Sequence, residues 1–137
     1  MISRKGALET PTYFDLMKIN LKDAIGQVDG YWNPLIVGEL NGQHMKVAKF
    51  KGEFDWHHHD NEDECFIVIR GSFEMHLRDR IEVINEGEFF IVPRGVEHRP
   101  VAKEETHVLL FEPATTVNTG NVISEKTQTV LKAYKPE

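Results

Sequence analysis

Turn signals recur through the middle of this 137-residue sequence and divide it into short apolar or alternating runs. The signals that each separate two runs are Asn41-Gly42, Arg70-Gly71, Asp79-Arg80, Glu86-Gly87 and Pro93-Arg94-Gly95. No helical window lies between these runs. Strands that follow one another at intervals of about 8–12 residues are typical of an all-β barrel or sandwich. The sequence therefore predicts a β-only fold for its central part.

This pattern divides the chain into three parts. Residues 1–34 form an N-terminal segment, in which Tyr13–Val28 is predicted as a short helix that begins near Asp15. Residues 35–113 form the barrel, and residues 114–137 form a polar tail that lies over the barrel or frays. The predicted strands are Leu35–Leu40, His44–Lys51, Glu64–Arg70, Ser72–Leu77, Ile81–Asn85, Phe89–Val92, His98–Ala102 and His107–Glu112.

The charge balance excludes several classes of partner. The chain has 22 acidic and 16 basic residues and a net charge of −6. This acidity argues against broad contacts with nucleic acid or with anionic membranes. The longest apolar run, Cys65 to Ile69, is much shorter than the roughly 20 residues of a membrane-spanning helix. With a single cysteine and no recognisable secretory signal, we expect a cytoplasmic protein.

Histidine is the unusual component of the composition, with seven residues of which three are consecutive. In an extended chain, His57 and His59 point to one face and His58 points to the other. Two neighbouring imidazoles are a natural start for a divalent metal site, although an HxH pair alone is a weak signal.

Four carboxylates follow the histidines at once. Strict alternation from His59 would turn Asp63 inward, but Asp60-Asn61-Glu62-Asp63 is a good turn and a poor strand. A turn here resets the alternation, so that Glu64 begins a new strand. The other three carboxylates are then expected in a solvated loop.

These residues resemble the two motifs of the cupin family. Gly52, His57, His59, Glu64 and Gly71 match the first motif, except that the gap from Gly52 to His57 is one residue shorter than usual. The second motif, G-x5-P-x-G-x2-H, is matched at every spacing by Gly87, Pro93, Gly95 and His98. Family members often have asparagine four residues after that histidine, where this chain has Ala102.

The resemblance implies a double-stranded β-helix, a jelly-roll-like barrel, in which His57, His59, Glu64 and His98 are the metal ligands. Three imidazoles and one carboxylate suit one divalent transition metal per chain, which is Fe, Mn, Ni, Co, Cu or Zn. Four protein ligands would leave a coordination position open for a small molecule. The native metal and the substrate are not predicted.

The other candidate residues receive structural interpretations. His58 is expected to point away from the pair, and His44, His76 and His107 are expected on the surface, without a predicted role. Cys65 is expected as a buried inert thiol. Glu97 and Arg99 are expected either to contact the metal ligands or to be exposed to solvent. The remaining candidates are assigned to the barrel core: Trp56, Phe66, Val68, Phe73 and Met75.

Two functions are compatible with the sequence. The first is a metal-dependent enzyme that acts on a small polar metabolite, of the dioxygenase, isomerase or lyase type. The second is a non-enzymatic barrel that binds a sugar or an organic acid. No catalytic acid/base pair and no organic cofactor site stand out. Because a small open barrel has exposed strand edges, and many cupins are dimers, we also expect a homodimer, joined through Leu35–Leu40 or the stretch before it.

Overall fold

The computed structural model describes residues 16–136 of the chain, in which one short helix precedes seven strands. The elements are α1 (Leu21–Ile25), β1 (Leu35–Leu40), β2 (Gln43–Glu53), β3 (Glu64–Arg70), β4 (Ser72–Leu77), β5 (Ile81–Asn85), β6 (Phe89–Val92) and β7 (His98–Pro113). Strands and turns lie where the alternation and the turn signals predict them, with one exception at β7.

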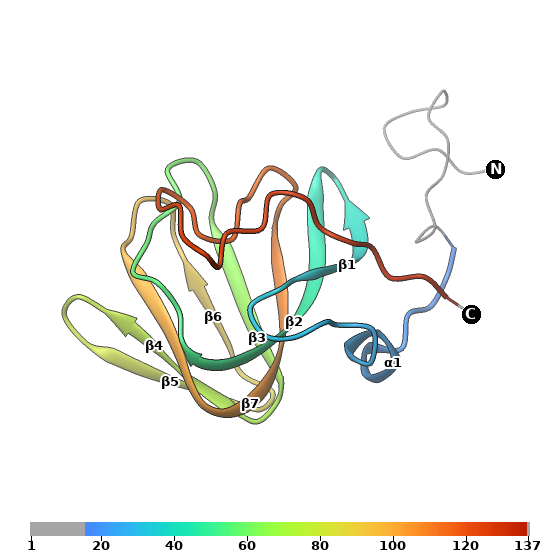
Figure 1. Cartoon of the computed structure of the whole chain (residues 1–137), viewed down its shortest axis with the longest axis horizontal. Helices are drawn as coiled ribbons and strands as arrows, with labels where there is room; N and C mark the ends of the chain where they lie inside the picture. The colour runs from blue at the N-terminus through green and yellow to red at the C-terminus, as the bar shows by residue number, and fades with distance from the viewer. Residues whose placement is uncertain (1–15, 137) are drawn as a thin grey trace.

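All strand pairs are antiparallel, and their order is β1-β2-β7-β3-β6, with β4 attached to β7 and β5 attached to β4 (Figure 1). The strand β7 joins the two parts of the barrel. Its first half lies between β4 and β2, where Val101 lies opposite Glu74 on one side and Glu53 on the other. Its second half lies between β2 and β3, where Leu110 lies opposite Lys46 on one side and Phe66 on the other.

The prediction of two separate strands, His98–Ala102 and His107–Glu112, is therefore wrong. Both belong to one 16-residue strand, which stays extended through three exposed residues, Lys103 to Glu105. These polar residues resemble a loop in the sequence. In the structure they lie where β3 replaces β4 as one neighbour and where the register with β2 shifts. Pairing resumes beyond them, so the backbone of the strand stays extended.

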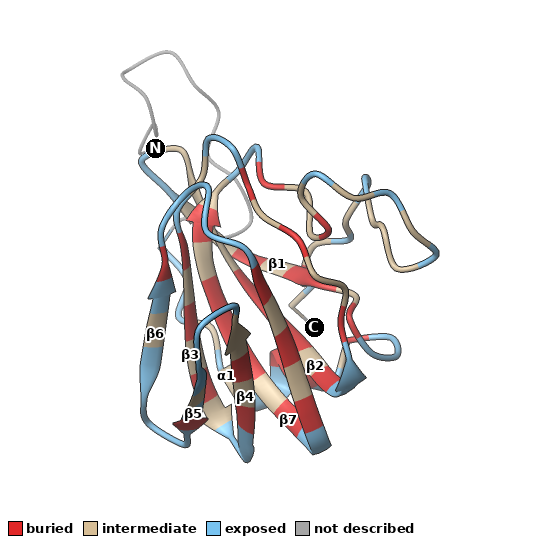
Figure 2. Cartoon of the chain, turned by 90° about the vertical axis from the view of Figure 1, so that its left-hand side faces the viewer, coloured by how far each residue is buried: buried red, intermediate tan, exposed pale blue. Residues whose placement is uncertain are grey.

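Alternating burial along β3 and β4 places one face of each strand in the core (Figure 2). As predicted, Phe66, Val68, Phe73 and Met75 are buried. Each such side chain contributes about 1.5–3 kcal/mol by leaving water. The assignment of Trp56 to the core is wrong, because its half-buried ring lies 3.9 Å from the Arg78 guanidinium.

The predicted helix is much shorter than its pattern suggests. α1 covers only Leu21–Ile25, and the predicted start at Asp15 lies outside the described residues. Asn20 caps the helix, since its side-chain oxygen accepts a hydrogen bond of 3.0 Å from the Asp23 amide. Gly26 follows the helix as its C-cap. The two residues that least favour helix thus mark its ends.

The C-terminal tail lies over the barrel and, where the structure describes it, packs against it (Figure 1). Thr116 and Thr119 are buried, and Tyr134 donates its amide to the Ile36 carbonyl at the outer edge of β1. Within residues 16–136, no helix is long and apolar enough to cross a membrane.

Candidate metal centre

Four buried side chains converge inside the barrel, and they are the four that the sequence singles out. Ligand atoms of His57, His59, Glu64 and His98 all lie within 4.8 Å of one another. None of these residues is more than 4% exposed. Glu64 is the first residue of β3, as the reset alternation predicts, and His98 is the first residue of β7.

The two histidines of the HxH pair lie in an extended segment between β2 and β3 rather than at the end of a strand. A backbone bridge fixes this segment to β7, because the amides and carbonyls of His57 and His98 exchange hydrogen bonds of 3.1 and 2.9 Å. The His59 carbonyl accepts a bond of 2.8 Å from the amide of Gly95, in the turn before β7. These contacts bring together residues that are far apart in the sequence.

Backbone carbonyls select the tautomers of two of the rings. His57 Nδ1 lies 2.8 Å from the Asp55 carbonyl oxygen, and His98 Nδ1 lies 2.9 Å from that of Val96. A carbonyl oxygen only accepts, so each Nδ1 carries the proton, and each neutral ring keeps a lone pair on Nε2. A ring arranged in this way is ready to bind a metal through Nε2.

The carboxylate of Glu64 faces the Nε2 atoms of His98 and His59. Its Oε1 lies 3.3 Å from His98 Nε2 and 3.1 Å from His59 Nε2. In a neutral His98 of this tautomer, both facing atoms are acceptors, and His59 Nε2 has no well-aligned hydrogen-bond partner among residues 16–136. A shared cation would satisfy this set of facing acceptors. The donor chemistry therefore fits a divalent metal.

The electrostatics of the cluster favour a charged Glu64 and a neutral His57, and they shift His59 toward its charged form. Burial, helped by His98, lowers the pKa of His57 to about 4. Burial alone would raise the pKa of Glu64, but its contacts with His59 and His98 hold it well below its ordinary value. Burial also lowers the pKa of His59, and the neighbouring Glu64 outweighs this, so that its net shift is upward.

A second buried charged group, which sequence reasoning missed, adjoins the cluster. Lys46 Nζ donates to Glu112 Oε1 at 3.0 Å, and both side chains are at most 3% exposed. Burial and the neighbouring Glu64 raise the pKa of Glu112, while Lys46 opposes this shift. A signal existed in the sequence, because Lys46 interrupts an apolar stretch of β2 and Glu112 follows Leu109, Leu110 and Phe111.

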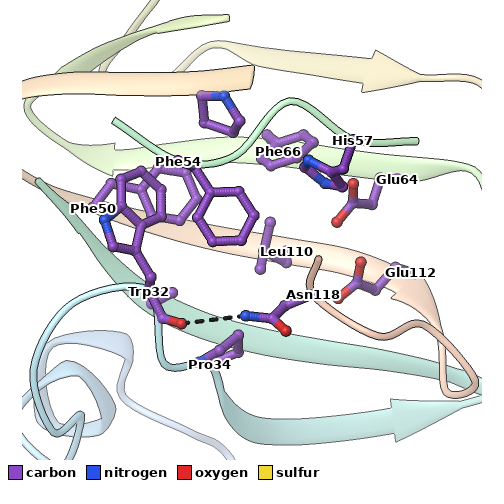
Figure 3. A pocket seen from close by; sticks show the side chains of 12 residues that line it. Trp32, Pro34, Phe50, Phe54, His57, Glu64, Phe66, Leu110, Glu112 and Asn118 are labelled. Carbon is purple, nitrogen blue, oxygen red and sulfur yellow. Dashed lines mark hydrogen bonds between the residues drawn. The ribbon is translucent and has the colours of Figure 1, made fainter. Parts of the chain in front are cut away.

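A small cavity of about 30 Å³ lies beside the cluster, which is room for one or two water-sized groups. Figure 3 shows the carboxylates of Glu64 and Glu112 at one side and the rings of Trp32, Phe50 and Phe54 at the other. The indole of Trp32 stacks on Phe50 with ring centroids 4.4 Å apart. The cavity thus has a polar end and an aromatic wall.

The C-terminal tail closes the site from outside. The His58 amide donates to Asn121 Oδ1 at 2.8 Å, and the Asn121 amide donates to the His58 carbonyl at 3.0 Å. Ser124 Oγ donates to the Asp55 carboxylate at 2.6 Å. Asn118, from the same tail, lines the cavity. His57 and His59 are therefore held between the barrel and this cover.

Gly120 is the point of closest approach of the tail. A Cβ atom here would collide with the carbonyl of His58, and the backbone φ of 54° already favours glycine. We expect Gly120→Ala to displace the tail and to lower the free energy of unfolding by about 1–3 kcal/mol. Denaturant melts and limited proteolysis would measure this; Gly42→Ala, also at positive φ but with open space around it, is the control. Equal effects of both variants would contradict the close contact.

Each of the other four histidines pairs with a nearby carboxylate, and none joins the cluster. His58 points away from the pair, as predicted, and lies 2.9 Å from Asp60. The surface positions expected for His44, His76 and His107 are wrong in part, since their side chains are only 15–17% exposed. Their carboxylate partners are Glu39, Glu74 and Glu105, at 3.4, 3.0 and 2.8 Å.

The remaining candidates lie outside the cluster. Glu97 is exposed and pairs with Arg78 at 3.3 Å. The guanidinium of Arg99 lies 5.4 Å from the Trp56 ring. Cys65 faces away from Glu64, as expected, but it is only half-buried, so the prediction of a buried thiol is wrong. Burial still raises the pKa of this thiol. Asp60 and Asp63 are exposed and Glu62 is half-buried, which fits the predicted solvated loop.

Comparison with known proteins decides the family. The cupin domain model matches residues 43–112, which are half of the chain and include all four clustered residues. The chain belongs to the cupin family. The antiparallel barrel is accordingly the cupin fold that the two motifs predict, with one short helix before it.

Similar proteins and solved structures agree with this assignment. A cupin-2 domain protein from Shewanella frigidimarina superposes with a TM-score of 0.68 at 39% identity, over 69% of this chain and 93% of that one. Protein NMB1881 from Neisseria meningitidis gives 0.65 at 29% identity, over 72% and 100%. The uncharacterised protein YdbB of Bacillus subtilis is 36% identical over 64 residues. That match spans 46% of this cupin and 57% of YdbB.

Proposed function

We propose that this cupin is a metal-dependent enzyme that acts on a small polar metabolite, with His57, His59, Glu64 and His98 as the ligands of one divalent transition metal. The observation that carries the proposal is the convergence of three imidazoles and a carboxylate, buried and within 4.8 Å. The donor set suits Fe, Mn, Ni, Co, Cu or Zn. A bound metal of this kind would supply Lewis-acid or redox chemistry.

The chain's own residues would prepare the site for that chemistry. Asp55 and Val96 hold the rings of His57 and His98 through their carbonyls, so both Nε2 atoms stay aimed at the centre. The aromatic wall and the C-terminal tail restrict the access of water. The experiment is to load the protein with each candidate metal and to measure oxygen uptake and products with a panel of small acids, diketones, flavonols and sugars.

A second candidate is a barrel that binds its small molecule, a sugar or an organic acid, without converting it. The observation that favours it is the small, covered cavity, which holds only one or two water-sized groups. Binding by the metal-loaded protein with no product from any panel member would support this candidate. Turnover of any one compound would support the enzyme.

Metal affinity is expected to fall as the pH drops through about 6.5, where unperturbed imidazoles take up protons and stop donating. We assign this loss of affinity mainly to protonation of His59, whose pKa is raised. His57, with a pKa of about 4, stays neutral to a lower pH. Calorimetric titrations with Zn²⁺ at pH 5.5, 6.5 and 7.5, in two buffers of different ionisation enthalpy, would count the released protons. Proton release that does not increase toward acid pH would contradict this assignment.

We also propose a cytoplasmic homodimer. The expected edge, Leu35–Leu40, is covered in part, because Ile36 donates to the Lys132 carbonyl and accepts from the Tyr134 amide. Within residues 16–136, β6 pairs only with β3, and its Phe89 and Ile91 are 64% and 52% exposed. This second edge supports the proposal better. Light scattering at micromolar concentration should give twice the chain mass of 15.8 kDa. A measured mass equal to that of one chain would contradict the dimer.

A further inference from the structure

The stretch of the C-terminal tail that covers the metal centre, residues 118–128, is held together by its own hydrogen bonds. The side-chain oxygen of Asn118 accepts from the Gln128 amide at 2.8 Å, across the two ends of the loop. In its middle, the hydroxyls of Thr119 and Thr127 form a hydrogen bond of 2.7 Å. A surface loop that is closed at its ends and packed by its own side chains is a compact unit.

Few contacts join this loop to the barrel. Among the residues that the structure describes, four hydrogen bonds do so, and the three of at most 3.0 Å join Asn121 to His58 and Ser124 to Asp55. None of the loop's large apolar side chains is buried, and that of Ile123 is 92% exposed. Release of the loop from the barrel therefore breaks few bonds and exposes little apolar surface.

The tail is anchored on both sides of the loop. Before the loop, the Ala114 amide donates to the Gly42 carbonyl at 3.0 Å, and Thr116 is buried. After the loop, the Tyr134 amide donates to the Ile36 carbonyl at 2.7 Å. The loop can thus leave the site while the rest of the tail stays in place.

The metal centre has no room for a metabolite while the loop covers it. The cavity of about 30 Å³ holds only one or two water-sized groups. Asn118 lines this cavity, and Gly120 lies against the carbonyl of His58 and near the ring of His57 (Figure 3). The aromatic residues on the opposite wall belong to the packed core: Trp32, Phe50, Phe54 and Phe66. Of the surroundings of the cavity, the loop is therefore the part that moves at the least cost.

We propose that residues 118–128 are a lid, which opens as a unit to admit a metal ion and a small molecule to the centre and then closes over them. The inference rests on the proposed function, because only a centre that binds a metal and a metabolite needs such access. A closing loop excludes water from a reaction, and its opening can limit the rate. The lid supplies none of the four clustered side chains, so its opening sets how fast a metal enters and leaves rather than how tightly it binds.

The test loosens the lid without changing a metal ligand. Asn121→Ala/Ser124→Ala removes the side-chain bonds of the lid to the His58 amide and to the Asp55 carboxylate. Ile123→Ala is the matched control, because its side chain lies in the same loop and is exposed. Stopped-flow measurements with a zinc indicator give the rate of zinc uptake, and transfer of zinc to excess EDTA gives the rate of loss. Competition with a chelator gives the dissociation constant separately.

The double variant should take up and lose zinc at least about fivefold faster than the wild type, with a dissociation constant that changes by less than about twofold. The control should behave like the wild type. Unchanged rates would overturn the lid, and so would faster loss with unchanged uptake, because the loop would then only shape the site. If the double variant does not fold, Asn121→Ala replaces it, with both rates expected to rise at least about twofold and unchanged rates again contradictory.

Hydrogen exchange of the zinc-free protein separates this inference from the proposed function. A wild type that takes up no zinc contradicts the metal centre, and the lid is then judged by exchange alone. The Asn121 amide, which donates to the His58 carbonyl across the contact, should be protected at least about 100-fold less than the Val108 amide in the middle of β7. Equal protection of the two amides would mean that the loop is released only by global unfolding, and it would overturn the lid.

Discussion

Replacing His98 by alanine is expected to lower the affinity for a divalent metal by more than about 100-fold. Loss of a residue that only orients a ligand typically costs 10–100-fold, and His98 is placed as a ligand itself. Its ring is fully buried, its Nδ1 is held by the Val96 carbonyl, and its Nε2 faces Glu64 at 3.3 Å. Elemental analysis after reconstitution and dialysis, followed by competition with a chelator, would measure the loss.

His58→Ala is the matched control for this experiment. It removes a neighbouring imidazole of the same HxH segment, which points away from the cluster and pairs with Asp60. Full metal occupancy in His98→Ala together with loss in His58→Ala would contradict the ligand assignment. Metal-loaded wild type should also melt at a higher temperature than metal-free protein, because the unfolded chain cannot reproduce a site assembled from residues 57 to 98.

Most of the candidate site could be predicted from the spacing of the residues in the two motifs. A turn at residues 60–63 places Glu64 at the start of a strand, and its buried position follows from local chemistry alone. The close approach of His57 to His98 depends on a backbone bridge between distant segments. Periodicity does not reveal such a bridge, so the resemblance to a family supplies what the local pattern lacks.

Three errors of the sequence analysis share one physical cause, which is tertiary contact between residues of mixed character. Trp56 is aromatic and is expected in the core, yet Arg78 and Arg99 cover its ring near the surface. Lys103 to Glu105 look like a loop, yet pairing on both sides of them keeps β7 continuous. The sequence suggests that His44, His76 and His107 are solvated, yet each is mostly buried and paired with a neighbouring carboxylate.

The pair of Lys46 and Glu112 is the clearest case in which only the fold reveals a residue's role. The two are 66 positions apart, and the register of β2 with β7 brings them together in the interior. Two charges withdrawn from water cost several kcal/mol each, and their mutual attraction offsets this cost only while both are present. The pair therefore predicts an unusual pattern of mutational effects on stability.

Lys46→Met alone is expected to lower the free energy of unfolding by about 3–5 kcal/mol near neutral pH, because it leaves the Glu112 carboxylate buried beside Glu64 without its cation. The loss should shrink as the pH falls and Glu112 takes up a proton, since neutralisation removes the unpaired charge. Urea melts of the metal-free protein at pH 5.5 and 7.5 would measure both effects.

The double variant Lys46→Met/Glu112→Leu distinguishes charge from shape. Replacing a whole buried ion pair by apolar side chains of similar size is often neutral or stabilising by about 1–4 kcal/mol, so the double variant should recover most of what the single variant loses. A double variant as unstable as Lys46→Met would mean that packing, and not the unpaired carboxylate, causes the loss.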